Sequence, residues 1–182
     1  MSSNSDDLIL VTGSSGFIAT HIVKQLLEFG FRVRGTVRDL GNESKLASLK
    51  NLALRAEHHL ELCQADLLDE HSWLSAVNGC SHVIHTASPF PSSLPENEQE
   101  LIGPAVNGTL FVLRACVQPE ATVRVRRVVL TSSVAAVAGD VFESGHVYRE
   151  NDWPDLKLLN PYPKRLVKDK LIQKNKSNLL PL

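Results

Sequence analysis

The chain has 182 residues, of which 43% are hydrophobic and 21% charged, and its formal net charge is −1. This length suits one globular domain with a core of its own, and the balanced charge argues against a general binder of nucleic acid or acidic membranes. The three cysteines, Cys63, Cys80 and Cys116, stand far apart without paired spacing. They indicate reduced buried thiols rather than a disulfide framework or a zinc site.

Neither a membrane span nor a targeting segment is predicted. No apolar run approaches the roughly 20 residues of a membrane-spanning helix, and residues 1–7 are polar and acidic. The seven histidines and the carboxylates show no metal-ligand spacing, so we expect no metal. A soluble cytoplasmic protein is therefore expected.

Strand patterns recur at regular intervals along the chain. Short runs that are continuously apolar or alternate in polarity predict strands at 8–11, 31–37, 60–63, 82–85 and 127–131. Helical periodicity lies between them, at 17–29, 43–55, 69–77 and within 96–117. This alternation predicts an α/β fold with a doubly wound, mostly parallel sheet that helices cover on both faces.

Two helices carry further local signals. The first has one apolar face and a stop at Gly30; the residues of this face are Ile18, Ile22, Val23, Leu26 and Leu27. In the helix within 96–117, Pro104 either kinks the helix or begins a new first turn.

A glycine-rich loop follows the first strand, in the segment Thr12-Gly-Ser-Ser-Gly-Phe-Ile-Ala19. Gly13 permits a tight turn, Gly16 lets backbone N–H groups approach a diphosphate, and the small Ala19 lets the helix pack on the sheet. The helix N-terminus then faces the anion. Because this loop stands between a strand and a helix, we interpret it as a dinucleotide-binding loop rather than a plain structural turn.

The second strand ends in Arg38-Asp39, where NAD-binding folds place a carboxylate for the ribose 2′-hydroxyl. Here a guanidinium comes first, and it can stack on adenine and bind a 2′-phosphate. Lys45 lies one helix turn further on. We therefore expect NADP(H) to be favoured over NAD(H). Asp39 argues against this preference, because a carboxylate at this position is typical of NAD-binding folds. The alternative interpretation is a solvated Arg38–Asp39 pair.

Polar residues also follow the third and fourth strands. Asp66 either bonds the adenine amino group or caps the next helix. Thr86-Ala87-Ser88 either lets a cofactor cross the carboxyl edge of the sheet or is an ordinary turn.

The chain resembles the extended short-chain dehydrogenase/reductase superfamily, and within it the dihydroflavonol reductase, cinnamoyl-CoA reductase and aldehyde/ketone reductase group. Beside the glycine-rich loop, the matching segments are 34–39, 65–69, 83–89, 104–109 and 128–134. They cover nearly all of residues 8 to about 164, in order. The resemblance implies a Rossmann-type NAD(P)-binding domain.

The resemblance also implies individual roles in cofactor binding. The residues that match its cofactor contacts are Gly13, Ser15, Gly16, Phe17 and Ile18 for the diphosphate, Arg38 and Lys45 for the 2′-phosphate, Asp66 and Leu67 for adenine, and Thr86, Ala87 and Ser88 near the nicotinamide ribose.

In the same family, a serine and a tyrosine act on the substrate, and Ser133 and Tyr162 match them. The nicotinamide supplies hydride to a carbonyl carbon, and the carbonyl oxygen then needs a proton from a positioned acid. A tyrosine provides this proton when a nearby cation lowers its pKa. Without the ordered set of motifs, Tyr162 between two prolines would indicate only a packing or turn residue.

The sequence departs from the family where the cation is expected. The family's lysine stands four residues after the tyrosine, and this chain has Leu166 there. Lys164 and Lys168, at i+2 and i+6, fall on other faces of a helix that turns about 100° per residue.

The second departure is length. We expect residues 1–164 to form the NAD(P)-binding domain and 165–182 to be an atypical tail, with the family's substrate lobe missing. The sheet would then be incomplete on its C-terminal side, leaving an uncovered edge and exposed apolar faces. A truncated isoform or a frameshifted gene model is expected, since the codons of Val167-Lys168-Asp169, read one base later, can encode the family's Ser-Lys-Thr.

Three functional hypotheses follow. The first is an NADPH-dependent reductase of a small-molecule carbonyl compound. The second is a non-catalytic dinucleotide-binding fragment or pseudoenzyme. For the 182-residue chain itself, the sequence favours this second hypothesis over catalytic activity. The third is a nucleotide-sugar epimerase or dehydratase, or a hydroxysteroid dehydrogenase. The substrate, the reaction direction and the oligomeric state are not predicted.

Overall fold

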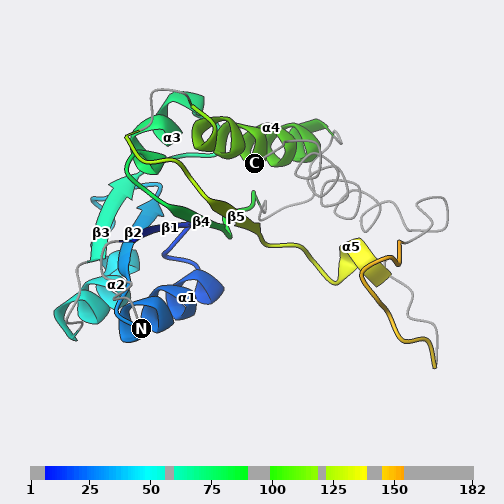
Figure 1. Cartoon of the computed structure of the whole chain (residues 1–182), viewed down its shortest axis with the longest axis horizontal. Helices are drawn as coiled ribbons and strands as arrows, with labels where there is room; N and C mark the ends of the chain where they lie inside the picture. The colour runs from blue at the N-terminus through cyan, green and yellow to red at the C-terminus, as the bar shows by residue number, and fades with distance from the viewer. Residues whose placement is uncertain (1–6, 56–59, 90–98, 119–121, 139–144, 154–182) are drawn as a thin grey trace.

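A parallel β-sheet forms the centre of the molecule (Figure 1). The computed structural model describes residues 7–55, 60–89, 99–118, 122–138 and 145–153. Five strands pair in the order β3-β2-β1-β4-β5, and every pairing is parallel. The strands are β1 (Leu8–Thr12), β2 (Arg32–Val37), β3 (Leu60–Gln64), β4 (His82–His85) and β5 (Arg127–Leu130). Each predicted strand is confirmed, with ends that agree within one residue.

Helices cover the sheet on both faces, as Figure 1 shows. The helices are α1 (Phe17–Glu28), α2 (Glu43–Arg55), α3 (Glu70–Val77), α4 (Gln99–Cys116) and the short α5 (Ala135–Ala138). One apolar cluster joins α1 and α2 to the sheet, and another joins α3 and α4 to its opposite face. The predicted doubly wound α/β fold is thereby confirmed.

The central strand β1 shows why its sequence is continuously apolar. All of its residues are buried, with Leu10 in the cluster beneath α3 and α4 and Val11 in the cluster beneath α1 and α2. A parallel strand covered on both faces needs apolar side chains at successive positions, not at alternate ones.

The ends of α1 follow from local chemistry. Gly30 has a φ of 82° and lies just after the C-cap Phe29. Its N–H donates to the Leu27 carbonyl, while the Phe31 N–H donates to Leu26, which is the Schellman arrangement. The predicted stop at Gly30 is confirmed.

Two helix predictions need correction. Ile18, predicted on the buried face of α1, is 62% exposed because the first turn of the helix lies at the carboxyl edge of the sheet. Pro104 lies inside α4, so the alternative that it begins a new helix was wrong. The short α5 was not predicted.

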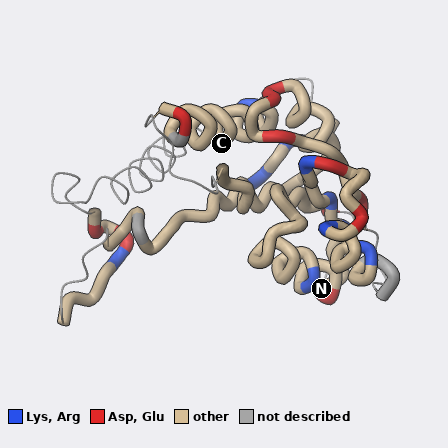
Figure 2. Tube along the Cα trace, turned by 180° about the vertical axis from the view of Figure 1, so that it is seen from behind, with Lys and Arg blue, Asp and Glu red and all other residues tan. Residues whose placement is uncertain are grey.

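Strand β5 forms one edge of the sheet within the described residues, and Val129 at its centre is 51% exposed. The sequence predicted an uncovered edge at the fifth strand. Basic and acidic positions are interspersed over the described chain (Figure 2).

The three cysteines converge although they are distant in sequence. Cys80 and Cys116 are buried in the cluster beneath α3 and α4, and Cys63 packs against it. All three are free thiols. Burial raises the pKa of Cys80 to about 11 and that of Cys116 to about 12.

These raised pKa values predict unreactive thiols. At about pH 8, a thiol with a pKa near 11 is ionised to only about 0.1%, and the thiolate is the reactive form. We expect Cys80 and Cys116 to react with an aromatic disulfide reagent at least about 100-fold more slowly in the native chain than in urea. Absorbance in a Cys63→Ser variant measures this directly, and equal rates in the two conditions would contradict the buried placement.

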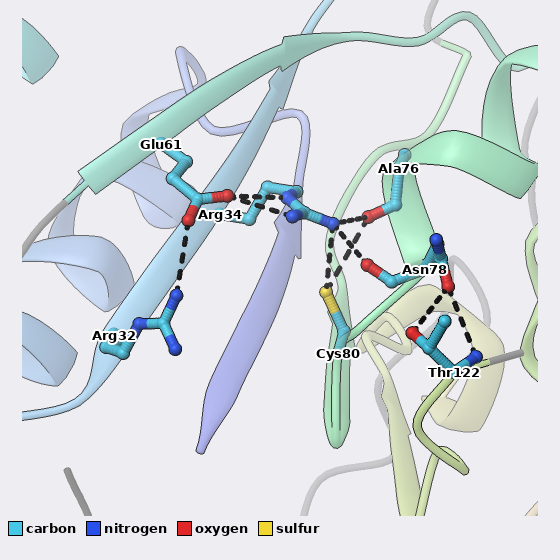
Figure 3. Close-up of polar contacts among 7 residues, drawn as sticks. All are labelled: Arg32, Arg34, Glu61, Ala76, Asn78, Cys80 and Thr122. Atoms are coloured by element: carbon cyan, nitrogen blue, oxygen red, sulfur yellow. Dashed lines mark hydrogen bonds and ion pairs between the residues drawn. The ribbon is translucent and has the colours of Figure 1, made fainter. Parts of the chain in front are cut away.

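The side chain of Arg34 connects the end of α3 to strands β2 and β3 (Figure 3). The Arg34 guanidinium on β2 lies 2.9 Å from a Glu61 carboxylate oxygen on β3. Its Nη1 also donates to the carbonyl oxygens of Ala76 at 3.0 Å and Asn78 at 2.6 Å, at the end of α3. Arg34 thus satisfies carbonyl groups that the helix end leaves without intrahelical partners.

Candidate functional site

The carboxyl ends of β1, β2 and β4 lie side by side, because Val11 pairs with Gly35 and Thr12 with His85. In parallel α/β sheets, ligands bind at this edge. The loops that leave these three strands carry most of the predicted cofactor residues. The edge is therefore the candidate site.

The glycine-rich loop has the geometry that its glycines predict. Gly13 has a φ of 64°, in the left-handed region that favours glycine. A Cβ at this position would lie 3.1 Å from the Ala87 Cβ, so the loop also passes close to the chain after β4. The Gly16 N–H donates to the Gly13 carbonyl at 2.9 Å and closes the turn that leads into α1.

Unpartnered N–H groups gather where α1 begins. Its N-cap is Gly16, which provides no side-chain cap. Within the part of the chain that the structure describes, the backbone N–H groups of Ser15, Phe17 and Ile18 donate to no acceptor. These residues are exposed, so an anion can reach them. Such donors at a helix N-terminus favour a phosphate group.

Thr12 joins the loop to the chain that follows β4. Its Oγ1 accepts the N–H groups of Thr86 and Ala87, both at 3.0 Å, and lies 2.7 Å from His85 Nδ1. The Thr86 hydroxyl donates to the Thr12 carbonyl. This places the predicted Thr86 and Ala87 beside the glycine-rich loop. Ser88 follows them and is exposed.

Sequence reasoning missed Thr12 and His85. Both are almost completely buried, with exposed fractions of 0% and 1%. The sequence did contain a signal for them: each is a polar residue at the last position of its strand, Thr12 in β1 and His85 in β4.

Arg38 lies just beyond β2 and is exposed, as is Lys45 on α2. Among the described residues Arg38 forms no ion pair. The neighbouring Asp39 carboxylate instead accepts the Gly41 N–H at 2.8 Å. Arg38 and Asp39 are both exposed, and the alternative interpretation as a solvated Arg38–Asp39 pair stays untested.

Asp66 and Leu67 lie in the turn between β3 and α3. Asp66 Oδ1 accepts the Leu68 N–H at 2.9 Å, whereas the cap of α3 is Asp69, which accepts the His71 N–H. The alternative that Asp66 caps this helix was wrong. Leu67 packs against Gly108 of α4, where a Cβ would lie 2.8 Å from the Leu67 Cβ.

The predicted catalytic pair is divided between described and undescribed parts of the chain. Ser133 follows β5, is half-buried, and accepts the Ala136 N–H through its carbonyl oxygen. Tyr162 and Leu166 lie outside the described residues. Elsewhere in the described part, no group of His, Cys, Asp and Glu side chains is arranged to hold a metal ion. None of the described helices combines the length and apolar character needed to cross a bilayer.

The sequence matches the 3-beta hydroxysteroid dehydrogenase/isomerase family over residues 10–179. It is 43% identical to a dihydroflavonol 4-reductase of Arabidopsis thaliana over 153 aligned residues, and these cover 84% of this chain and 39% of that protein. It is 45% identical over 137 residues to a cinnamoyl-CoA reductase of Medicago truncatula, covering 75% of this chain and 41% of the relative. The predicted resemblance to the dihydroflavonol and cinnamoyl-CoA reductase group is confirmed.

Solved reductases share the fold. Vestitone reductase from alfalfa (Medicago sativa) superposes with a TM-score of 0.72 at 29% identity, covering 94% of this chain and 53% of that one. The Candida albicans reductase Gre2 in complex with NADPH gives a TM-score of 0.74 at 31% identity, covering 95% of this chain and 52% of that one. The chain thus spans about two fifths of the length of the curated relatives it matches and about half of these structures.

Proposed function

Because this chain belongs to the 3-beta hydroxysteroid dehydrogenase/isomerase family, we propose that it binds NADPH at the carboxyl edge of its sheet and serves the reduction of a carbonyl group. One observation carries this proposal: at the start of α1, the exposed residues Ser15, Phe17 and Ile18 have backbone N–H groups that are unpartnered among the described residues. The matched relatives are reductases, which supports an oxidoreductase.

We assign each part of the dinucleotide to a group of described residues. The glycine-rich loop binds the diphosphate, Asp66 and Leu67 flank the adenine, and Thr86, Ala87 and Ser88 lie beside the nicotinamide ribose. Arg38 and Lys45 bind the 2′-phosphate, which favours NADPH over NADH. The solved NADPH complex of the Candida albicans reductase supports this choice of cofactor.

Two residues act on the substrate in this proposal. Bound NADPH supplies a hydride to the carbonyl carbon. The Ser133 hydroxyl donates a hydrogen bond to the carbonyl oxygen, and Tyr162 gives that oxygen a proton. The substrate is a small carbonyl compound, not a nucleic acid or a membrane. Three free thiols support a reducing compartment, the cytoplasm.

A second candidate function is dinucleotide binding without catalysis. Leu166 favours it, because a leucine cannot provide the cation that lowers the pKa of a nearby tyrosine. Absorbance of NADPH during incubation of the purified chain with aliphatic and aromatic aldehydes separates the candidates. Turnover that Ser133→Ala and Tyr162→Phe abolish supports the reductase. Binding without turnover supports the second candidate, and turnover gained in Leu166→Lys identifies the missing cation as the cause.

Removing the guanidinium of Arg38 tests the choice of cofactor. Arg38→Ala is expected to raise the dissociation constant of NADPH by about 10- to 100-fold, the effect of losing charge-assisted bonds to a phosphate. The constant of NADH, which lacks the 2′-phosphate, should change by less than about threefold. Nucleotide fluorescence measures both constants.

Arg124→Ala is the matched control, since Arg124 is also exposed but precedes β5 at the opposite edge of the sheet. It is expected to leave both constants unchanged. If Arg38→Ala weakens NADH as much as NADPH, Arg38 does not select the 2′-phosphate.

A further inference from the structure

The glycine-rich loop is anchored to β2 by Thr36. The Thr36 hydroxyl accepts the Gly13 N–H at 3.0 Å. Its carbonyl accepts both the Ser14 N–H at 2.9 Å and the Ser14 hydroxyl at 3.0 Å. Thr36 and Ser14 are almost completely buried, at 1% and 0% exposed. One residue of β2 therefore takes three donors from two successive loop residues.

The neighbouring residue of β2 makes room for this contact. A Cβ on Gly35 would lie 2.5 Å from Ser14 Oγ and 2.9 Å from Ser14 Cβ. The Ser14 side chain thus occupies the space that any other residue at position 35 would fill. Gly35, Thr36 and Ser14 form one unit, which we call the β2 anchor.

The β2 anchor divides the loop N–H groups into two sets. Those of Gly13 and Ser14 are bonded to Thr36, and that of Gly16 is bonded to Gly13. The N–H groups of Ser15, Phe17 and Ile18 remain unpartnered among the described residues. Before any ligand binds, the β2 anchor therefore determines which backbone N–H groups of the loop remain for a diphosphate.

We propose that Thr36 is a positioning residue of the dinucleotide site, which presents the Ser15, Phe17 and Ile18 N–H groups by holding those of Gly13 and Ser14 away. This inference rests on the proposed function. Thr36 also stands two residues before Arg38, so the same residue ties the diphosphate loop to the segment that binds the 2′-phosphate. Preorganised donors bind an anion without the cost of ordering the loop.

Thr36→Val tests the proposal because valine keeps the branched shape of threonine and replaces its hydroxyl with a methyl group, which cannot accept the Gly13 N–H. It is expected to raise the dissociation constants of NADPH and NADH alike by about tenfold, as the loss of one ordering hydrogen bond implies. Thr36→Ser keeps the acceptor and should restore both constants to within about threefold of wild type. Fluorescence titrations of folded protein, verified by circular dichroism, provide the values.

Thr109→Val is the control, since Thr109 is another buried threonine, and its hydroxyl donates to the Ala105 carbonyl within α4. It should leave binding unchanged. If wild type binds and Thr36→Val binds equally well, or if Thr36→Ser is as weak as Thr36→Val, this inference is overturned while the proposed function stands. If wild type binds neither nucleotide, the proposed function fails and this inference fails with it.

Amide hydrogen exchange in the free wild-type chain provides a second test that needs no variant. The Gly13 and Ser14 amides are expected to exchange at least about tenfold more slowly than the Ser15 amide, because only the first two are bonded to Thr36. Equal exchange of all three amides would overturn the proposal even if Thr36→Val failed to fold.

Discussion

Replacing Gly35 with alanine is expected to lower the free energy of unfolding by about 2–4 kcal/mol. The new Cβ would stand 2.5 Å from Ser14 Oγ and 2.9 Å from its Cβ, far inside van der Waals contact. Ser14 cannot retreat without breaking its two bonds to the Thr36 carbonyl, and the surroundings are fully buried. Urea denaturation followed by circular dichroism measures the loss.

A double-mutant cycle assigns this cost to the overlap. In a Ser14→Gly background the obstructing side chain is gone, so Gly35→Ala should cost less than about 1 kcal/mol. Gly103→Ala is the matched control within α4, where a Cβ meets nothing within 4 Å. It should be neutral or stabilising by up to about 1 kcal/mol, because alanine favours a helix more than glycine does. An equal cost of Gly35→Ala in both backgrounds would contradict the overlap with Ser14.

Replacing Arg34 with methionine is the second large effect, a loss of about 2–4 kcal/mol in the free energy of unfolding. Methionine fills a similar volume but removes the guanidinium that donates to the Ala76 and Asn78 carbonyls, and it leaves Glu61 with only the longer contact to Arg32 among the described residues (Figure 3). Arg34→Lys should lie between wild type and Arg34→Met, because one ammonium group cannot reproduce the planar fork of a guanidinium.

Arg32→Met is the control for charge on the same strand. Arg32 also approaches Glu61, at 3.5 Å, but its side chain is 45% exposed, whereas that of Arg34 is 18% exposed. Exposed ion pairs contribute little, so Arg32→Met should cost less than about 1 kcal/mol. Equal losses from the two variants would show that the carbonyl contacts of Arg34 do not stabilise α3.

The sheet was predictable because each strand is a short local run that is apolar or alternates in polarity, and its parallel pairing follows from alternation with helices. The glycine-rich loop was predictable for the same reason, since its residues are adjacent in sequence. The four-residue α5 carries too little periodicity to be read from the chain. Ile18 was placed on the buried face of α1 because periodicity alone does not say where a helix passes the end of the sheet.

The contacts that hold the site together were not predictable. Ser14 rather than Ser15 anchors the loop, and this depends on Gly35 standing opposite β1 in the pairing of Val11 with Gly35. Likewise, the bond between Thr12 and His85 joins residues 73 positions apart. Strand register decides both, and register is a property of the folded sheet.

In our proposal, the start of α1 binds the diphosphate of NADPH through the Ser15, Phe17 and Ile18 amides. Titration of the isotope-labelled chain with NADPH, followed by amide nuclear magnetic resonance, tests this binding. We predict saturable shifts of the Ser15, Phe17 and Ile18 amide signals, with the Gly79 amide at the opposite edge of the sheet unchanged. If those three signals do not shift at saturating NADPH, the start of α1 does not bind the diphosphate.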